Sequence, residues 1–167
     1  MKKPLITIAA LLVAAHAIAT NDDQPIVAIT WAKDGQPLVV GSHRFVDSTG
    51  ALVPFAATMQ QRFPYSTCTL EGSQPTYQSK QLAIGRTLIL EPQRTPRGTI
   101  HLDIQAEDTA VRTVKTTDHG TCRSMSPVTD ALSLTSLPVD LPAEGAITVS
   151  FPDAHYSLTL RFERDAQ

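Results

Sequence analysis

The segment TIHLDIQA, residues 99–106, alternates polar and apolar side chains without a break. Successive side chains of a β-strand point to opposite faces, so one row of this segment faces a core and the other faces water. The apolar row is Ile100, Leu102, Ile104 and Ala106. This period of two predicts a half-buried β-strand, and after residue 19 no helical periodicity persists for three turns.

Further alternating segments lie on both sides of this strand, and each is bounded by turn residues. Residues 147–151 and 156–162 are separated by Pro152 and Asp153, which predicts an antiparallel hairpin. The other expected strands are residues 27–31, 38–46, 65–70, 87–90, 110–116 and 132–137. Their spacing of roughly 8–12 residues predicts an all-β fold, a single-domain antiparallel β-sandwich of seven to nine short strands with immunoglobulin-like architecture.

Prolines and paired acids mark the segments that we expect to be irregular. Pro54 limits residues 51–59 to an edge strand or an irregular segment. Three prolines in residues 124–145 leave room only for a short strand within a connector. The adjacent acids Glu107 and Asp108 are expected in a turn, which places no pair of carboxylates across a cleft for glycoside hydrolysis.

The first nineteen residues have the organisation of a secretory signal peptide. Lys2 and Lys3 precede the apolar residues 5–15, and Ala17-Ile18-Ala19 is a cleavage site of the small-x-small type. We therefore expect residues 1–19 to be removed and residues 20–167 to form one domain, which begins at Thr20. The two leading lysines favour bacterial export to the periplasm, with an extracellular location as the alternative.

The charge of the expected mature chain is mildly acidic. Without the two lysines of the signal peptide, 12 Lys and Arg face 16 Asp and Glu, and the basic residues are dispersed. Nucleic acids and anionic membranes require clustered basic residues, so we expect neither as a partner. No second apolar run approaches the ~20 residues of a transmembrane helix, and no glycine-rich loop begins a helix to hold a nucleotide. The sequence predicts no membrane insertion after signal cleavage and no cofactor.

Cys68 and Cys122 are the only cysteines. In an oxidising compartment a lone pair predicts one intramolecular disulfide, whereas redox motifs place their cysteines two residues apart. Closing a loop of this length stabilises the fold by about 4 kcal/mol in the chain-entropy model. We expect Cys122 in or beside a loop, and a bridge that joins two non-adjacent segments, with a crossing between the sheets as one option. Trp31 precedes both cysteines, which argues against a true immunoglobulin domain.

The histidines suggest the alternative function, a periplasmic copper- or zinc-binding protein. His101 and Asp103 share one face of a strand, and His155 on another strand would complete a site, with Met59 or Met125 as a copper ligand. The sequence contains no HExxH, CxxC or His-x-His motif. Our main expectation is therefore that these histidines are solvated and that no metal is bound.

A small hydrolase is the third hypothesis, beside a binding protein and a metal-binding protein. Asp118, His119, Ser124 and Ser126 lie close together in the sequence, but no Gly-x-Ser-x-Gly elbow or Ser-x-x-Lys motif aims a hydroxyl at a base. A triad would require His119, Asp118 and Ser126 to come within hydrogen-bond reach. We expect the chain not to be an enzyme.

The sequence Met-Gln-Gln-Arg-Phe-Pro-Tyr, residues 59–65, is the best candidate for recognition. Arg62, Phe63 and Tyr65 are of the residue types enriched at interface hot spots, although the two aromatic residues would also serve to close the end of the sandwich. The sequence thus predicts an exported, non-enzymatic binding protein of the bacterial cell envelope. Its partner would be a protein or a cell-envelope component, and its role that of an accessory subunit or an inhibitor.

Overall fold

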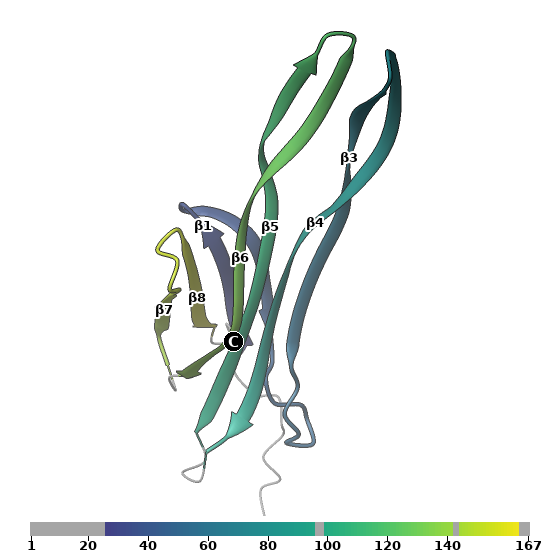
Figure 1. Ribbon diagram of the computed structural model, residues 1–167. Coiled ribbons are helices and arrows are strands. Elements are labelled where there is room, and N and C mark those ends of the chain that lie inside the picture. The colour runs from purple at the N-terminus through teal and green to yellow at the C-terminus, as the bar shows by residue number, and fades with distance from the viewer. Residues whose placement is uncertain (1–25, 96–98, 142–143, 164–167) are drawn as a thin grey trace, which may run out of the picture.

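The fold is a two-layer β-sandwich from which two long hairpins project (Figure 1). The computed structural model describes residues 26–95, 99–141 and 144–163. The expected signal peptide and Thr20 lie outside the described residues. The described part of the chain forms eight strands and no helix.

Two four-stranded antiparallel sheets make up the structure. The first has the order β2-β1-β8-β7, with β1 (Ile26–Lys33), β2 (Gln36–His43), β7 (Ala146–Ser150) and β8 (Tyr156–Glu163). The second has the order β3-β4-β5-β6, with β3 (Phe55–Glu71), β4 (Gln74–Arg94), β5 (Ile100–His119) and β6 (Cys122–Asp140). The predicted antiparallel sandwich is confirmed, as are the hairpins β1–β2 and β7–β8.

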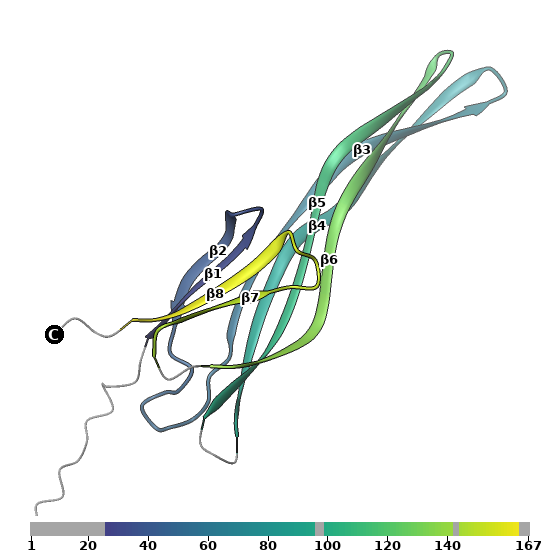
Figure 2. The same cartoon turned by 90° about the vertical axis from the view of Figure 1, so that its left-hand side faces the viewer.

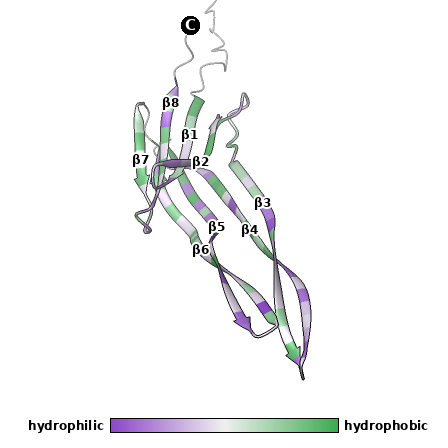
Figure 3. Cartoon of the chain, turned by 90° about the horizontal axis from the view of Figure 1, so that it is seen from above, coloured by the Kyte–Doolittle hydropathy of each residue, from purple (hydrophilic) through white to green (hydrophobic). Residues whose placement is uncertain are grey.

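The core lies between the two sheets and is filled by the rows that the alternation predicts. Leu102, Ile104 and Ala106 of β5 are buried, and Ile100 packs against them at the edge of the core. The remaining large buried side chains come from both sheets: Val27, Ile29, Trp31, Leu88, Leu90, Leu158 and Leu160. Figure 3 shows hydrophilic and hydrophobic residues alternating along the strands. Burial of these apolar rows is the main stabilising term of the fold.

Four strands are much longer than the sequence predicts. β3, β4, β5 and β6 contain 17, 21, 20 and 19 residues. For residues 51–59 the edge-strand option is confirmed from Phe55 onward and the irregular option is wrong there, because β3 is the edge strand of its sheet. The expected connector over residues 124–145 is strand up to Asp140. Cys122 is the first residue of β6 and lies directly beside the turn at Gly120 and Thr121, as one of the two options predicted. Glu107 and Asp108 lie within β5 and not in the expected turn.

The prolines within the long strands lie where a strand has only one hydrogen-bonded neighbour. Pro64 is in the edge strand β3, and Pro127 and Pro138 are in the edge strand β6. Pro92 of β4 lies beyond Leu90, where the pairing with β3 has ended. A proline cannot donate to a ladder, but at these positions no donor is required on the open side.

The two hairpins separate at one point and continue as an arm. β4 and β5 pair from Arg94 and Ile100 as far as Gly85 and Thr109, and no described pair joins them beyond that point. We call residues 61–84 and 110–130 the arm, and the remaining described residues the body. Figure 2 shows the arm reaching well past the first sheet.

Within the arm the strands of each hairpin cross, as Figure 1 shows. β3 and β6 are the outermost strands of the sheet near the body, yet they contact each other in the arm. Two-stranded ribbons twist more strongly than wide sheets, and the register shift between Val111 and Thr113 is a bulge of the kind that adds twist. The crossing therefore turns the outer edges of the two hairpins toward each other.

Gly85 lies at the point where the hairpins separate, and its backbone passes very close to β3. A Cβ atom built on Gly85 would lie 2.2 Å from the carbonyl oxygen of Met59 and 2.9 Å from the Cα of Gln60. Both neighbours are backbone atoms, so no side-chain rotation would relieve the clash. Only glycine fits this approach of β4 to β3.

Replacing Gly85 by alanine should lower the free energy of unfolding by about 1–3 kcal/mol, because the strands must separate to admit the methyl group. Urea unfolding followed by circular dichroism measures this change. Gly41→Ala is the matched control, since its Cβ would meet the Phe55 ring at an ordinary 3.6 Å. Equal stabilities of the Gly85→Ala and Gly41→Ala variants would contradict the close approach.

Candidate functional site

The two hairpins of the arm are joined by a disulfide between Cys68 of β3 and Cys122 of β6. Their Cα atoms are 5.5 Å apart across a sequence separation of 54 residues. The predicted bridge is confirmed. The option of a bridge between the two sheets is wrong, because both cysteines belong to strands of the second sheet.

Hydrogen bonds near the disulfide also join the two hairpins. The Ser124 hydroxyl accepts a hydrogen bond from the Cys68 backbone N–H at 2.8 Å and donates one to the Cys68 carbonyl oxygen at 3.1 Å. The Tyr77 hydroxyl donates to the Thr121 carbonyl oxygen at 3.0 Å. Each of these contacts joins one hairpin to the other, so the arm is closed at both ends: by the β4–β5 ladder near the body and by the bridge near the tips.

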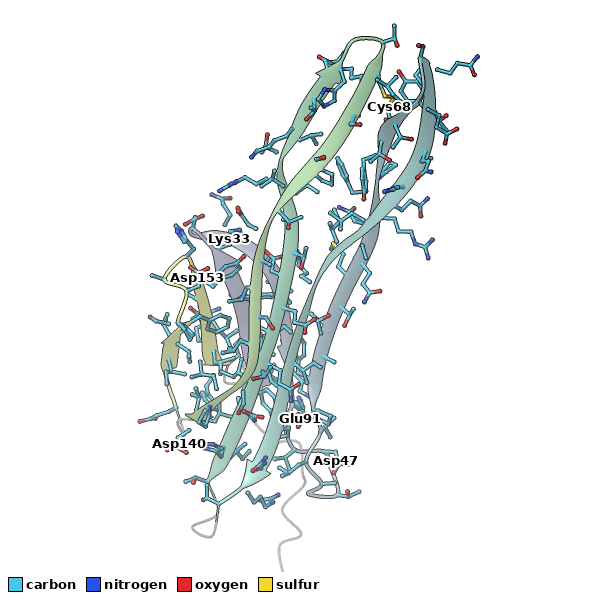
Figure 4. All side chains as sticks on the ribbon, in the orientation of Figure 1. Lys33, Asp47, Cys68, Glu91, Asp140 and Asp153 are labelled. Atoms are coloured by element: carbon cyan, nitrogen blue, oxygen red, sulfur yellow. A yellow bond between two sulfur atoms is a disulfide. The ribbon has the colours of Figure 1, made fainter. Side chains whose placement is uncertain are left out.

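Two large apolar side chains lie exposed beside the bridge. Tyr77 is directly opposite Cys68 in the β3–β4 register, and Leu70 is two residues beyond Cys68 on β3, so all three point to the same face of the hairpin. Tyr77 is 56% exposed and Leu70 is 47% exposed. Figure 4 shows Cys68 near the far end of the arm, remote from the labelled residues of the body. We call Leu70 and Tyr77 the tip surface.

A cleft of about 530 Å³ lies at the base of the arm, where β4 and β5 stop pairing. Three strands line it: β3 contributes Gln60, Gln61 and Arg62, β4 contributes residues 83–87, and β5 contributes Glu107 and Thr109. The lining includes three charged residues, Arg62, Arg86 and Glu107. Arg62 and Glu107 lie on one face of the second sheet, whereas Arg86 lies on the other face with its register partner Asp108. Hydroxyl and amide groups supply the other polar contacts.

Both arginines of the cleft are held by neighbouring side chains. Arg62 donates from Nη1 to the Gln81 side-chain oxygen at 3.2 Å. Arg86 places its Nε 3.6 Å from a carboxylate oxygen of Asp108, which is only 1% exposed. A buried carboxylate is costly unless it is paired, so Asp108 and Arg86 stabilise each other.

Asp108 also joins the base of the arm to the first sheet. Its second carboxylate oxygen accepts a hydrogen bond from the Tyr156 hydroxyl at 2.9 Å. Burial raises the pKa of Tyr156, the hydrogen bond with Lys33 acts in the opposite direction, and the neighbouring Asp108 raises the pKa further. Lys33 lies over the Tyr156 ring, with Nζ 5.1 Å from its centroid and 3.9 Å from a carboxylate oxygen of Asp130. The sequence analysis missed Asp108 because it placed this acid in a turn, whereas its position in the alternating row of β5 indicates burial.

The residues predicted to bind a partner do not form one surface. Arg62 lies on one face of β3, and Phe63 and Tyr65 lie on the other, because neighbouring side chains alternate. Arg62 is exposed and lines the cleft, while both aromatic rings are half-buried. Whether any of them contacts a partner stays a prediction.

The structure does not bring the candidate metal ligands together. His101 Nδ1 lies 2.9 Å from Asp140, His155 Nδ1 lies 2.6 Å from Asp34, and Asp103 accepts a hydrogen bond from Ser136. Figure 4 shows Asp140 and Asp153, which is two residues before His155, at opposite ends of the body. Among the described residues no group of three or more His, Cys, Asp or Glu side chains is arranged to hold a metal ion.

The candidate hydrolytic residues are also apart. Ser126 pairs with Lys115, four residues along β5 from His119, a separation of about 13 Å at the rise of a strand. Asp118 forms an ion pair with Arg123 at 3.4 Å, and Ser124 is engaged by Cys68. His119 and Ser126 are therefore not within hydrogen-bond reach of each other.

Comparison of the chain with protein-family models, with curated proteins and with solved structures finds no match. None of the described residues belongs to a helix that is long and apolar enough to cross a bilayer.

Replacing both Cys68 and Cys122 by serine should loosen the arm and leave the body folded. The chain-entropy model gives a loss of up to about 4 kcal/mol in the free energy of unfolding. Hydrogen exchange followed by mass spectrometry should show faster exchange in residues 61–84 and 110–130, with protection retained in β1 and β8. A uniform loss of protection across β1, β8 and the arm would contradict this division.

Replacing Asp34 by asparagine should lower the pKa of His155 toward its ordinary value. The hydrogen bond and charge of Asp34 raise the pKa of His155. A raised pKa in the folded state means that the pair stabilises the fold below the unfolded-state pKa, and that this contribution is lost as the pH rises through the folded-state pKa. Titration of the His155 ring by NMR measures the change. Asp140→Asn is the control, and an unchanged pKa of His155 in Asp34→Asn would contradict the assignment.

Proposed function

We propose that the chain is an exported, non-enzymatic binding protein of the bacterial cell envelope and that it engages its partner through the arm. The observation that carries this proposal is the tip surface, where Leu70 and Tyr77 are exposed at the end of a covalently closed arm. Aromatic side chains are enriched at the centres of protein interfaces. A partner in the periplasm agrees with the expected signal peptide, with an extracellular partner as the alternative.

The arm contributes nothing to the hydrophobic core of the body. The described residues that form the core cluster, or pack against it, all lie outside residues 61–84 and 110–130. Ordering a residue costs about 1–2 kcal/mol of backbone entropy, so an arm of this length needs its own means of stabilisation. The disulfide and the hydrogen bonds of Ser124 and Tyr77 supply part of it. A projecting element that is stabilised separately from the core is suited to presenting a surface to a partner.

A disulfide also supports the assignment to the envelope. Disulfides persist in the periplasm and outside the cell, and they are rare in proteins of the bacterial cytoplasm. Closing the arm before binding lowers the entropy that the partner must overcome, which favours affinity without additional contacts. An accessory subunit or an inhibitor of an envelope enzyme would each use a preformed surface in this way.

Site-specific photo-crosslinking in living cells tests the proposal. A photoreactive phenylalanine analogue at position 70 or 77 should give a crosslinked species, because both side chains lie exposed beside the bridge. The matched control is position 40, since Val40 is a 72% exposed apolar residue on β2 of the body. Crosslinks to a defined partner from positions 70 and 77, and none from position 40, are the expected result.

Two outcomes would overturn the proposal. Crosslinking from position 40 alone would place the binding surface on the body. Absence of any crosslink from positions 70 and 77, in cells where the exported variants accumulate with an intact disulfide, would remove the arm as the binding element.

A further inference from the structure

We propose that the free edge of β4 in the arm binds an extended segment of the partner polypeptide, which adds to the hairpin of β3 and β4 as a further strand. This inference deepens the proposed function and rests on it. Main-chain hydrogen bonds to β4 would hold the segment in place. Its apolar side chains, at every second position, would meet the apolar face of the hairpin.

β4 has a neighbouring strand on both sides in the body but only on one side in the arm. It pairs with β5 from Arg94 as far as Gly85, whereas its pairing with β3 continues to Gln74. Residues 74–84 therefore have no described strand beside them on the side away from β3. β3 meets the other hairpin through Cys68, and Figure 1 shows β4 on the outer side of the arm toward the tips. Backbone groups that point away from β3 alternate with those that point toward it, so this edge offers both donors and acceptors.

The other free edges of the described sheets carry features that oppose the addition of a strand. β3 and β6 contain prolines, and β5 in the arm carries three charged side chains and a bulge between Val111 and Thr113. In the body, β2 contains Pro37 and β7 has only 5 residues. Prolines, charges, bulges and short strands are the means by which proteins protect sheet edges. Residues 76–84 of β4 contain no proline and a single charged side chain, Lys80, so this edge is the least protected one.

An apolar row on one face of the hairpin lies beside this edge. Phe63 of β3 is directly opposite Leu82 of β4, and Ile84 follows two residues later on the same face. Phe63 and Leu82 are half-buried. A strand added beside β4 would place every second side chain next to Leu82 or Ile84, where an apolar residue gains contacts. The opposite face of β4 is polar at Ser79 and Gln81, so the segment that fits best alternates apolar and polar residues.

The free edge is continuous with the tip surface. Tyr77 belongs to the same segment of β4 and is 56% exposed, and Leu70 is 47% exposed and pairs with Pro75 at the end of the hairpin. A segment bound along residues 76–84 would therefore pass the Tyr77 ring. The tip surface and the edge would form one interface, in which exposed side chains and main-chain groups contact the same partner.

The test uses the mature chain with its disulfide intact and a short blocked peptide of alternating valine and threonine, which carries a polyethylene glycol tail for solubility. NMR on titration should show chemical-shift changes along residues 76–84, and alternate amides of this segment should exchange more slowly with solvent. Peptides methylated on the valine amides alone, or on the threonine amides alone, each keep one free edge, and at least one of them should bind. Methylation of every amide removes both edges and should weaken binding at least about tenfold.

A variant of the apolar row tests the side-chain contact. Leu82→Thr should weaken binding of the peptide about fivefold, because apolar contact area with the added strand is lost. Val114→Thr is the matched control, since Val114 is a half-buried apolar residue on β5 in the other hairpin, and its effect should stay within about twofold. The circular dichroism spectrum verifies the fold of both variants. The comparison of methylated peptides uses the unchanged protein and does not depend on them.

Several results would overturn this inference. Equal affinity for the singly and the fully methylated peptides would show that main-chain hydrogen bonds do not hold the segment. Shift changes confined to β2, β5 or β7 would assign the peptide to another edge, and equal affinities of Leu82→Thr and Val114→Thr would contradict the contact with the apolar row. Absence of peptide binding together with crosslinking from positions 70 and 77 would reject the edge alone, whereas failure of the crosslinking would reject the general role of the arm.

Discussion

The crossing of the two hairpins, closed by the bond between Cys68 and Cys122, is the constraint on which the shape of the arm depends. Near the body β3 and β6 are separated by two strands, and near the tips they are covalently joined. Without a crossing in each hairpin, these outer edges would face away from each other. The crossing of each ribbon brings β3 and β6 within reach of the bridge, and the cleft lies where the pairing of β4 and β5 ends at Gly85.

A small group of buried polar side chains joins the body to the base of the arm. Asp108 receives Tyr156 from the first sheet and Arg86 from the second, so one buried carboxylate joins the two layers at the point where the arm begins. Removing Arg86 would leave the buried charge of Asp108 without its cation, and removing the Tyr156 hydroxyl would leave it without a hydrogen bond. The ion pair with Asp108 holds the Arg86 side chain on the face of the second sheet that meets the first sheet.

The alternation of residues 99–106 was sufficient to predict the sandwich, since core rows are a local property of each strand. The arm was not predictable in the same way. Pro64, Pro127 and Pro138 are tolerated because β3 and β6 are edge strands, and edge position depends on pairing between distant segments. Composition did identify Arg62, which lines the cleft, but the grouping of Arg62 with Phe63 ignored that neighbours on a strand face opposite ways. The burial of Asp108 was predictable from the sequence, because Asp108 continues the alternating row of Ile104 and Ala106, both of which are buried.

Because the arm and the body are separate, the stability of the fold and the presentation of a binding surface depend on different parts of the chain. Stability comes from the core residues of the body, so side chains on the arm are free to change without loss of core packing. An interface placed on the arm would use exposed Leu70 and Tyr77, which lie beside the disulfide that joins the two hairpins. The closed arm favours such an interface, since two hairpins that were not joined would have to be ordered on binding.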